Sequence, residues 1–232
     1  MNIILGLIAT VTILSAAGTS PKDISDIHPA IEDRTFDFGH VGIGYTIYHM
    51  FPFENKTGDT IRILRATANC DCGSVVALDS IVFPGDSTFF RLRYKTKDLY
   101  GPIKRSLAII TDHPLLDTMK YHYLSIVGQW FDGLRPEPPA LMFLPKKTSQ
   151  TVRIPNRGFD VISLSKVIQY DSSFSVTVIE DKAKHGSDLV LEIKPRADIK
   201  QGTYTTNATL YILTGKESDQ TILTLPIKIV RY

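Results

Sequence analysis

The side chains best able to do chemistry are the two cysteines of the chain, Cys70 and Cys72, which are separated by a single residue. In an oxidising compartment the pair can form a disulfide, which would stabilise the fold by only about 1.6 kcal/mol because the closed loop is short. Gly73 and the turn-prone Asn69 and Asp71 favour the bent backbone that such a bond needs. Two other interpretations stay open: a thiolate pair for a soft metal such as Cu(I) or for a redox reaction, and two inert, partly buried thiols.

The other residue types that commonly do chemistry show no pattern typical of an active site. A nucleophile elbow, a phosphate-binding loop and a dinucleotide-binding fingerprint are absent from the sequence. Residues 39–44 are rich in glycine, but no helical pattern follows them, so we interpret them as a turn. None of the six histidines has the spacing of a zinc site; they are His28, His40, His49, His113, His122 and His185. We therefore predict that the chain is not an enzyme and has no catalytic, cofactor-binding or metal-binding residues and no cofactor.

The N-terminal segment is unlike the rest of the chain, because residues 3–17 are almost wholly apolar and carry no charge. As a helix they would rise only about 22 Å, short of the roughly 30 Å hydrocarbon core of a bilayer. Ser15 and Ala17 place small residues at −3 and −1 of a cut after Ala17, so residues 1–17 are predicted to be a signal peptide. The segment before the apolar run lacks Lys and Arg, which leaves an uncleaved anchor as the alternative. We expect a periplasmic or secreted protein with no transmembrane span in the mature chain.

Charge and composition narrow the class of the protein. The formal net charge of +2 comes from 26 basic and 24 acidic residues scattered along the chain, which argues against a nucleic-acid partner. The sequence is rich in Val, Ile, Thr, Tyr and Phe and lacks helical periodicity, which predicts an all-β fold.

Short runs of strand-like sequence recur at regular intervals, separated by Gly, Pro, Asn and Asp. They cover residues 35–41, 45–53, 61–67, 88–94, 106–111 and 121–127. This spacing predicts an immunoglobulin-like β-sandwich with one face of each strand inside. The aromatic residues on two of these runs are expected on both faces of their strands, and an outward-facing patch of Phe89 and Tyr123 stays an alternative.

The second half of the chain repeats the turn and strand residues of the first at a constant offset of 101 positions. The pairs include Asn55 and Asn156, Asp59 and Asp160, Gly85 and Gly186, and Gly101 and Gly202. A proline-rich linker at residues 132–139 separates the halves. After an N-terminal extension at residues 18–34, we therefore predict two tandem immunoglobulin-like β-sandwich domains, at residues 35–131 and 140–232. The alternative is two unrelated sandwiches that share common turn residues.

The first domain carries a specific set of short motifs. They are Phe-Asp-Phe-Gly-His-Val at 36–41, Phe-Pro-Phe-Glu-Asn at 51–55, Cys-Asp-Cys-Gly at 70–73, Pro-Gly at 84–85, Thr-Asp-His-Pro at 111–114 and a final Gly128. Over residues 35–130 this pattern resembles the bacterial domain-of-unknown-function family 1573, which is similar to the Hydin-like branch of immunoglobulin folds. Asp71 replaces the glycine between the cysteines of the family, and residues 111–114 replace its Thr-Asn-Asp-Pro. The resemblance implies an exported sandwich and supplies no activity.

These observations favour an exported, non-catalytic binding or scaffolding protein of the bacterial cell envelope. Such a protein would contact an unidentified envelope protein through its loops or sheet edges. One alternative is a thiol- or copper-handling protein that uses Cys70 and Cys72. The other is a pilus-chaperone-like assembly factor, which needs a basic anchor between its domains; the basic residues close to the linker are Arg135, Lys146 and Lys147.

Overall fold

The computed structural model describes residues 34–114, 116–215 and 219–232. The predicted signal peptide at residues 1–17, and the predicted extension except for Arg34, lie outside the described residues. The described part consists of strands, loops and a one-turn 3-10 helix, Phe131–Gly133. The all-β fold predicted from the sequence is confirmed. No helix in this part of the chain is long and apolar enough to span a membrane.

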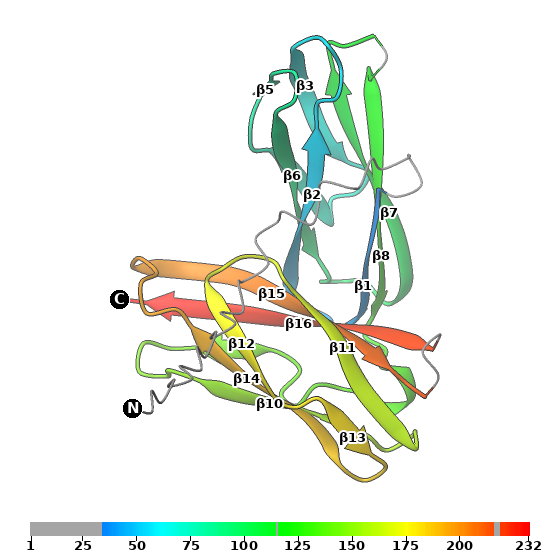
Figure 1. Cartoon of the computed structure of the whole chain (residues 1–232), viewed down its shortest axis with the longest axis vertical. Coiled ribbons are helices and arrows are strands. Elements are labelled where there is room, and N and C mark those ends of the chain that lie inside the picture. Colours follow the sequence, from blue (N-terminus) through cyan, green and yellow to red (C-terminus); the bar gives the residue numbers. More distant parts are fainter. Residues whose placement is uncertain (1–33, 115, 216–218) are drawn as a thin grey trace, which may run out of the picture.

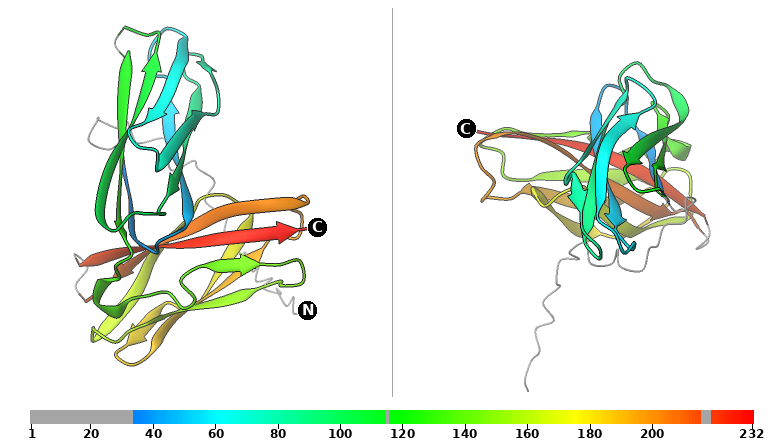
Figure 2. Two further views of the ribbon diagram at one scale, coloured as in Figure 1. Left: turned by 180° about the vertical axis from the view of Figure 1, so that it is seen from behind. Right: turned by 90° about the horizontal axis from the view of Figure 1, so that it is seen from above.

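The 3-10 helix divides the strands into two sets, which Figures 1 and 2 show as two sandwiches crossing at a steep angle. The first set is β1 (Thr35–Val41), β2 (Thr46–Glu54), β3 (Ile61–Ala68), β4 (Gly73–Ala77), β5 (Ile81–Val82), β6 (Ser87–Lys95), β7 (Gly101–Thr111) and β8 (Thr118–Val127). The second set is β9 (Leu141–Phe143), β10 (Gln150–Pro155), β11 (Val161–Gln169), β12 (Phe174–Glu180), β13 (Lys182–Lys184), β14 (Asp188–Pro195), β15 (Gly202–Leu213) and β16 (Gln220–Arg231).

Each sandwich packs a three-stranded antiparallel sheet against part of one long sheet. In the first, β2-β6-β4 faces β5-β3-β7-β8-β1; in the second, β10-β14-β12 faces β13-β11-β15-β16. Alternation of side chains decides which face is inside. On β6, for example, Phe90, Leu92 and Tyr94 are buried, whereas Arg91 and Arg93 are exposed.

The two sandwiches have separate cores of different composition. The first core is rich in aromatic rings; they are Phe36, Phe38, Phe51, Phe53, Phe90, Tyr94, Tyr121 and Tyr123. The second core is mostly Leu, Ile and Val, and Phe143 and Phe174 are its aromatic residues that are buried. The hydrophobic burial that stabilises each sandwich is thus obtained from different residue types.

Residues 101 positions apart occupy corresponding places in the two sandwiches. Asn55 and Asn156 are both fully buried, and their side-chain amides donate to the carbonyls of Val82 (2.8 Å) and Ala183 (3.0 Å). β9 pairs in parallel with β16 as β1 does with β8, again with residues 101 positions apart in register. The turn asparagines therefore satisfy the same buried carbonyl in each half.

The long sheet is continuous through both sandwiches, because β1 lies between β8 and β16. At this junction the Thr224 hydroxyl donates to the carbonyl of Phe38 at 2.6 Å. Gly39 has a left-handed φ of +59°, and a Cβ added there would lie 2.0 Å from the carbonyl oxygen of Ile222. A glycine is therefore required where β1 crosses β16.

Polar and aromatic groups add to the junction beside β2. The backbone N–H of Tyr48 donates to the Asn207 side chain at 2.7 Å, and the ring of Tyr48 stacks on Tyr170 with centroids 5.0 Å apart. Burial raises the pKa of Tyr170 to about 12, and the positive charge of Arg91 partly offsets that rise. By contrast, the basic side chains near the predicted linker are all exposed; they are Arg135, Lys146 and Lys147.

The predicted linker, residues 132–139, lies against the second sandwich. Leu134 is fully buried in the second core. Glu137 exchanges two backbone hydrogen bonds with Arg153 of β10, at 2.7 and 3.0 Å, and precedes a cis bond to Pro138. The proline-rich segment is thus anchored to the second sandwich at two points.

Candidate functional site

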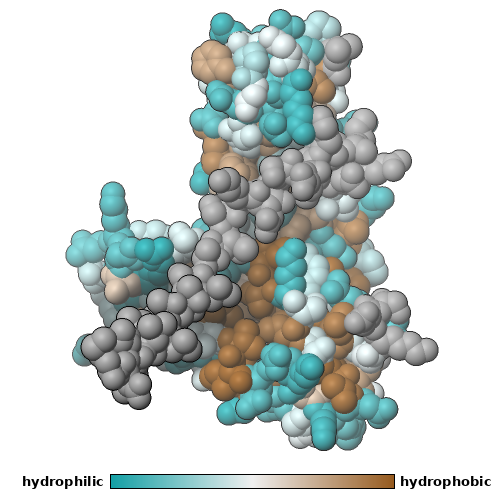
Figure 3. Space-filling model, in the orientation of Figure 1, coloured by the Kyte–Doolittle hydropathy of each residue, from teal (hydrophilic) through white to brown (hydrophobic). Residues whose placement is uncertain are grey.

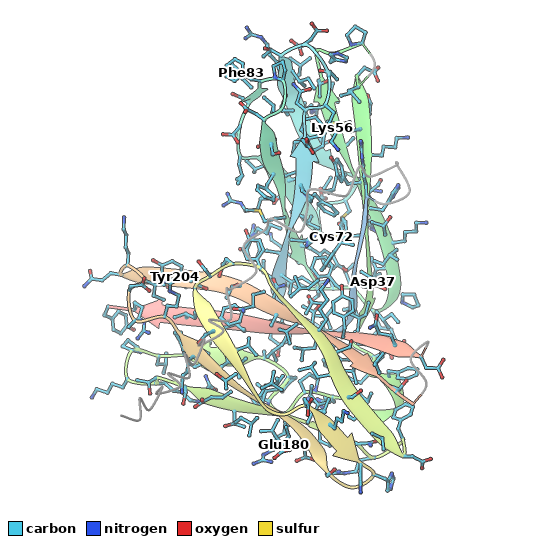
Figure 4. The ribbon with its side chains drawn as sticks, in the orientation of Figure 1. Asp37, Lys56, Cys72, Phe83, Glu180 and Tyr204 are labelled. Carbon is cyan, nitrogen blue, oxygen red and sulfur yellow. A yellow bond between two sulfur atoms is a disulfide. The ribbon has the colours of Figure 1, made fainter. Side chains whose placement is uncertain are left out.

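Cys70 and Cys72 lie in the turn that joins β3 to β4, and their sulfur atoms are bonded as a disulfide with the Cα atoms 5.2 Å apart. Both side chains are half-buried, and Asp71 between them is exposed. Backbone hydrogen bonds hold the turn on either side: Asn69 donates to Ser106 at 3.1 Å, and the carbonyl of Cys72 accepts from β6 at 2.7 Å. The turn is therefore fixed by the sheets as well as by the disulfide. Figure 4 shows Cys72 in the half of the first sandwich that is nearer the second sandwich.

A buried tyrosine hydroxyl lies beneath the disulfide. The Tyr123 oxygen is 3.5 Å from Cys70 Sγ and 3.9 Å from Cys72 Sγ. A Cβ added to Gly73 would lie 2.8 Å from this oxygen, so the glycine after the cysteines makes room for it. Burial raises the pKa of Tyr123 well above its usual value, so the hydroxyl stays protonated and can donate.

The hypothesis of an outward-facing patch is wrong for Tyr123. Tyr121 and Tyr123 are two positions apart on β8, so both side chains point to the same face, and that face is the core. Phe89 is half-buried on the outer face of β6.

Further polar groups surround the Tyr123 hydroxyl. The Tyr94 hydroxyl is 3.0 Å from the Ser125 hydroxyl in the buried interior. The positive charge of Arg105 acts on both tyrosines and partly offsets the rise that burial causes in the pKa of each. The disulfide thus lies above a small polar cluster inside an otherwise apolar core.

Two histidines of the first sandwich, His49 and His40, contact an aromatic ring and a backbone carbonyl. His49 stacks on Phe36 with centroids 3.6 Å apart, and burial lowers its pKa to about 3. His40 Nδ1 lies 2.8 Å from the carbonyl of Gln129. Within the described residues, no three His, Cys, Asp or Glu side chains lie close enough together to hold a metal ion.

The side of the first sandwich next to the disulfide is open. A hollow of about 230 Å³ separates β3 from β4; its lining residues are Ile63, Leu64, Arg65, Ala66, Val75, Val76, Ala77 and Ser80. Among the described strands, β4 pairs with β6, and β3 pairs with β7 and, through its first two residues, with β5. Within this part of the chain, the facing edges of β3 and β4 therefore have no strand partner over most of their length.

Alternation along β4 shows which backbone groups reach this open side. The N–H of Leu78 and the carbonyl of Cys72 bond to β6, so the even-numbered residues of this segment face β6. The N–H and C=O groups of Val75 and Ala77 consequently point into the open side.

Apolar side chains are exposed along the same edge. A β-bulge in β3 turns Leu64 outward, and 62% of its surface is accessible. The other large apolar side chains exposed here are Val76, Leu78, Ile81 and Phe83. Figure 4 shows Phe83 at the far tip of the first sandwich, and Figure 3 shows apolar surface at this end and on the second sandwich.

Basic side chains follow the outer face of β6 beside β4. Arg91, Arg93 and Lys95 are exposed, and Arg91 and Arg93 lie opposite Val76 and Ser74 of β4. Sequence reasoning missed this surface because it did not predict β4 as a strand.

The fold defines an all-β protein of the immunoglobulin-like class. Residues 30–126 match the model of the family described as "Protein of unknown function (DUF1573)", which confirms the family predicted from the sequence. The matched residues cover nearly all of the first sandwich. No curated protein matches the chain.

Several solved structures match the chain at low identity and low TM-score. An MSP-domain-like protein of Caenorhabditis elegans, SSP-19, is 14% identical, with a TM-score of 0.35 over 42% of this chain and 99% of that one. A protein of unknown function from Porphyromonas gingivalis W83 is 9% identical, with a TM-score of 0.31 over 82% and 96%. The CupB2 chaperone of Pseudomonas aeruginosa is 11% identical, with a TM-score of 0.30 over 80% and 95%.

Proposed function

We propose that this chain is an exported, non-catalytic binding protein of the bacterial cell envelope that captures an extended segment of a partner protein at the open side of its first sandwich. The observation that carries the proposal is the hollow between β3 and β4, where two strand edges that are mostly unpaired among the described residues flank an apolar surface. An exposed edge of this kind is a template for strand addition.

Backbone pairing would supply affinity, and alternation of side chains would supply selectivity. The free N–H and C=O groups of Val75 and Ala77 pair with the incoming strand. Every second side chain of that strand then packs into the hollow against Ile63 and Ala66. The intervening side chains face solvent on the side of Arg91 and Arg93, which favours acidic residues.

One feature of the sequence and one of the structure support an envelope location. Residues 3–17 have the length and composition of a signal-peptide core. A disulfide between the only two cysteines is typical of oxidising compartments such as the periplasm. N-terminal sequencing of the protein from the envelope fraction should start at Gly18; a cytosolic protein that starts at Met1 would contradict export.

We also infer that the two sandwiches are tandem copies of one module of about 100 residues. The support is the shared offset of 101 positions in the buried hydrogen bonds of Asn55 and Asn156. The copies have diverged beside the open side, since the turn between β11 and β12 has Asp171 and Ser173 where the first sandwich has its two cysteines.

The experiment measures the affinity of the full chain for synthetic peptides of about eight residues, the length of an ordinary strand. A peptide of alternating Val and Glu should bind, and it should bind more tightly than one of alternating Val and Lys. A control peptide of the same composition, with all its Val residues before all its Glu residues, should bind at least about tenfold more weakly than the alternating Val and Glu peptide. It cannot place one residue type on each face of a strand.

The Ala77→Pro variant removes one edge donor without interrupting the pairing of β4 with β6, and should weaken binding at least about tenfold. Val178→Pro makes the corresponding change on β12 and is the matched control, which should bind like the unmodified protein. Equal loss in both variants, or binding that ignores residue order, would overturn the proposal.

A further inference from the structure

We propose that Cys70 and Cys72 form an exchangeable redox pair that accepts two electrons from an external dithiol, and that the Tyr123 hydroxyl stabilises the thiolate formed. This activity goes beyond the proposed binding role and does not depend on it. The proposal rests on the comparison of one turn in the two sandwiches and on the contacts of the sulfur atoms.

The second sandwich closes the corresponding turn without a disulfide. Asp171 and Ser173 stand 101 positions after the two cysteines, and the Asp171 carboxylate accepts hydrogen bonds from the N–H (2.9 Å) and hydroxyl (2.5 Å) of Ser173. The flanking hydrogen bonds are also the same, because Tyr170 donates to Asn207 at 3.0 Å and Arg196 to Ser173 at 2.9 Å. The turn therefore does not need a disulfide in order to form.

It follows that reduction should leave the first turn in place. Its hydrogen bonds from Asn69 to Ser106 and from Lys95 to Cys72 use backbone groups and are independent of the sulfur atoms. A dithiol held in a fixed turn keeps its two sulfurs close, so the bond can form again without a search through open conformations.

The first sandwich is specialised at the position that meets the sulfurs. Where it has Gly73 and Tyr123, the second sandwich has Phe174 and Thr224, and the ring of Phe174 is buried in the core. The first sandwich has thus lost a packing side chain at residue 73 and placed a hydroxyl group at the sulfur atoms. A polar group buried in an apolar core is costly unless it is hydrogen-bonded, and the two sulfur atoms lie within reach of the Tyr123 hydroxyl.

Tyr123 and Arg105 are suited to stabilise a thiolate. The hydroxyl lies within hydrogen-bonding distance of both sulfurs, and Arg105 brings a positive charge to the same cluster. A hydrogen-bond donor and a nearby cation both lower the pKa of a thiol, which makes it a better leaving group in exchange.

The exchange proceeds in two balanced steps. Cys72 packs against the core, so the thiolate of an external dithiol attacks Cys70 Sγ, forms a mixed disulfide and breaks the bond to Cys72. Cys72 leaves as a thiolate with the electron pair and accepts the hydrogen bond of Tyr123. The second thiol of the donor loses its proton to solvent and attacks its partner sulfur in the mixed disulfide. This releases Cys70 as a thiolate and the donor as a disulfide; both cysteine thiolates then equilibrate with protons from solvent.

The test follows reduction of the folded, full-length protein by dithiothreitol, with alkylation of the thiols and mass spectrometry at intervals. Both cysteines should become alkylated without denaturant while the circular dichroism of the sandwiches is unchanged. Removal of the reductant and addition of oxidised dithiothreitol should restore the disulfide. A native protein that resists alkylation until it is denatured would overturn the proposal.

Variants separate the role of Tyr123 from a general effect on packing. Tyr123→Phe keeps the ring and removes the hydroxyl, and should slow reduction about tenfold, since hydrogen bonds to charged groups are the strong ones. Tyr94→Phe removes a neighbouring buried hydroxyl that bonds Ser125 rather than sulfur, and should change the rate less than about twofold. Equal rates in Tyr123→Phe and the unmodified protein would contradict the role of the hydroxyl. The pH at which Cys72 becomes half-alkylated in Cys70→Ser should rise when Tyr123→Phe is added; an unchanged pH would contradict it too.

Discussion

The two sandwiches share topology, turn hydrogen bonds and strand register, but their interiors differ in chemistry. The first encloses tyrosine hydroxyls and a histidine and has a disulfide at its edge. The second combines mostly aliphatic side chains with buried threonine hydroxyls and closes the same turn with Asp171 and Ser173. Turn residues and alternation are therefore enough to specify the fold. The disulfide and the Tyr123 hydroxyl beside it have no counterpart at the corresponding turn of the second sandwich, and this is why we assign function to the first half.

The largest loss of stability is expected from a substitution at the junction, where β1 of the first sandwich crosses β16 of the second. This substitution tests whether the long sheet runs through both sandwiches. Gly39→Ala places a Cβ against the carbonyl of Ile222 at a residue with left-handed φ, and should destabilise the protein by roughly 3–4 kcal/mol. Gly44→Ala is the control: its φ is +88° but nothing lies within 4 Å, so only about 1–2 kcal/mol is expected. Denaturant unfolding gives both values, and equal losses would mean that β1 does not press on β16.

Acid should distinguish the two cores. The folded-state pKa of His49 is about 3, below the usual 6.5, so the unfolded chain binds a proton between these pH values and the folded chain does not. The contribution of His49 to the free energy of unfolding is therefore fully present above pH 6.5 and is lost as the pH is lowered toward 3. Since His49 keeps some contact with solvent, we expect a loss of about 2–3 kcal/mol in the first sandwich. His49→Gln should remove the dependence; the same pH profile in that variant would contradict the assignment.

The buried turn asparagines should matter in both halves, but unequally. Asn55 makes hydrogen bonds to two carbonyls and accepts two from Thr57, whereas Asn156 bonds the carbonyl of Ala183 and the N–H of Phe159. Asn55→Ala should therefore cost about 3 kcal/mol and Asn156→Ala about 2 kcal/mol. Thermal unfolding of the two variants measures the difference, and a larger loss for Asn156→Ala would reverse the order that these contacts imply.

The smallest effect is expected from the disulfide. Replacing Cys70 and Cys72 with Ser should lower stability by only about 1.6 kcal/mol, since the loop is short and the corresponding turn of the second sandwich forms without sulfur. Calorimetry that shows the first sandwich unfolded in this double variant would contradict both arguments.

Much of the fold could be predicted from the sequence, because alternation and turn residues are local signals. The run at Thr88, Phe90, Leu92 and Tyr94 reveals the inward face of β6 directly. β4 was missed because Gly-Ser-Val-Val-Ala is short and lacks a clear alternation, and β5 has only two residues.

The site was harder to predict than the strands. Tyr123 is 53 positions from Cys70, and only packing of β8 beneath the β3–β4 turn brings them together. The offset of 101 positions did contain a usable signal, since it aligns the two cysteines with Asp171 and Ser173. The sequence contained no such signal for the junction, because Gly39 and Ile222, which meet there, are 183 positions apart (222 − 39).

Amide hydrogen exchange at β4 tests the central claim most directly. With a saturating amount of the alternating Val and Glu peptide, exchange at Val75 and Ala77 should slow at least about tenfold, because their N–H groups gain partners on the incoming strand. Exchange at Val178, the counterpart of Ala77 on the second sandwich, should be unchanged. Peptide binding that leaves Val75 and Ala77 unprotected, or that protects Val178 instead, would show that the open side of the first sandwich is not the binding surface.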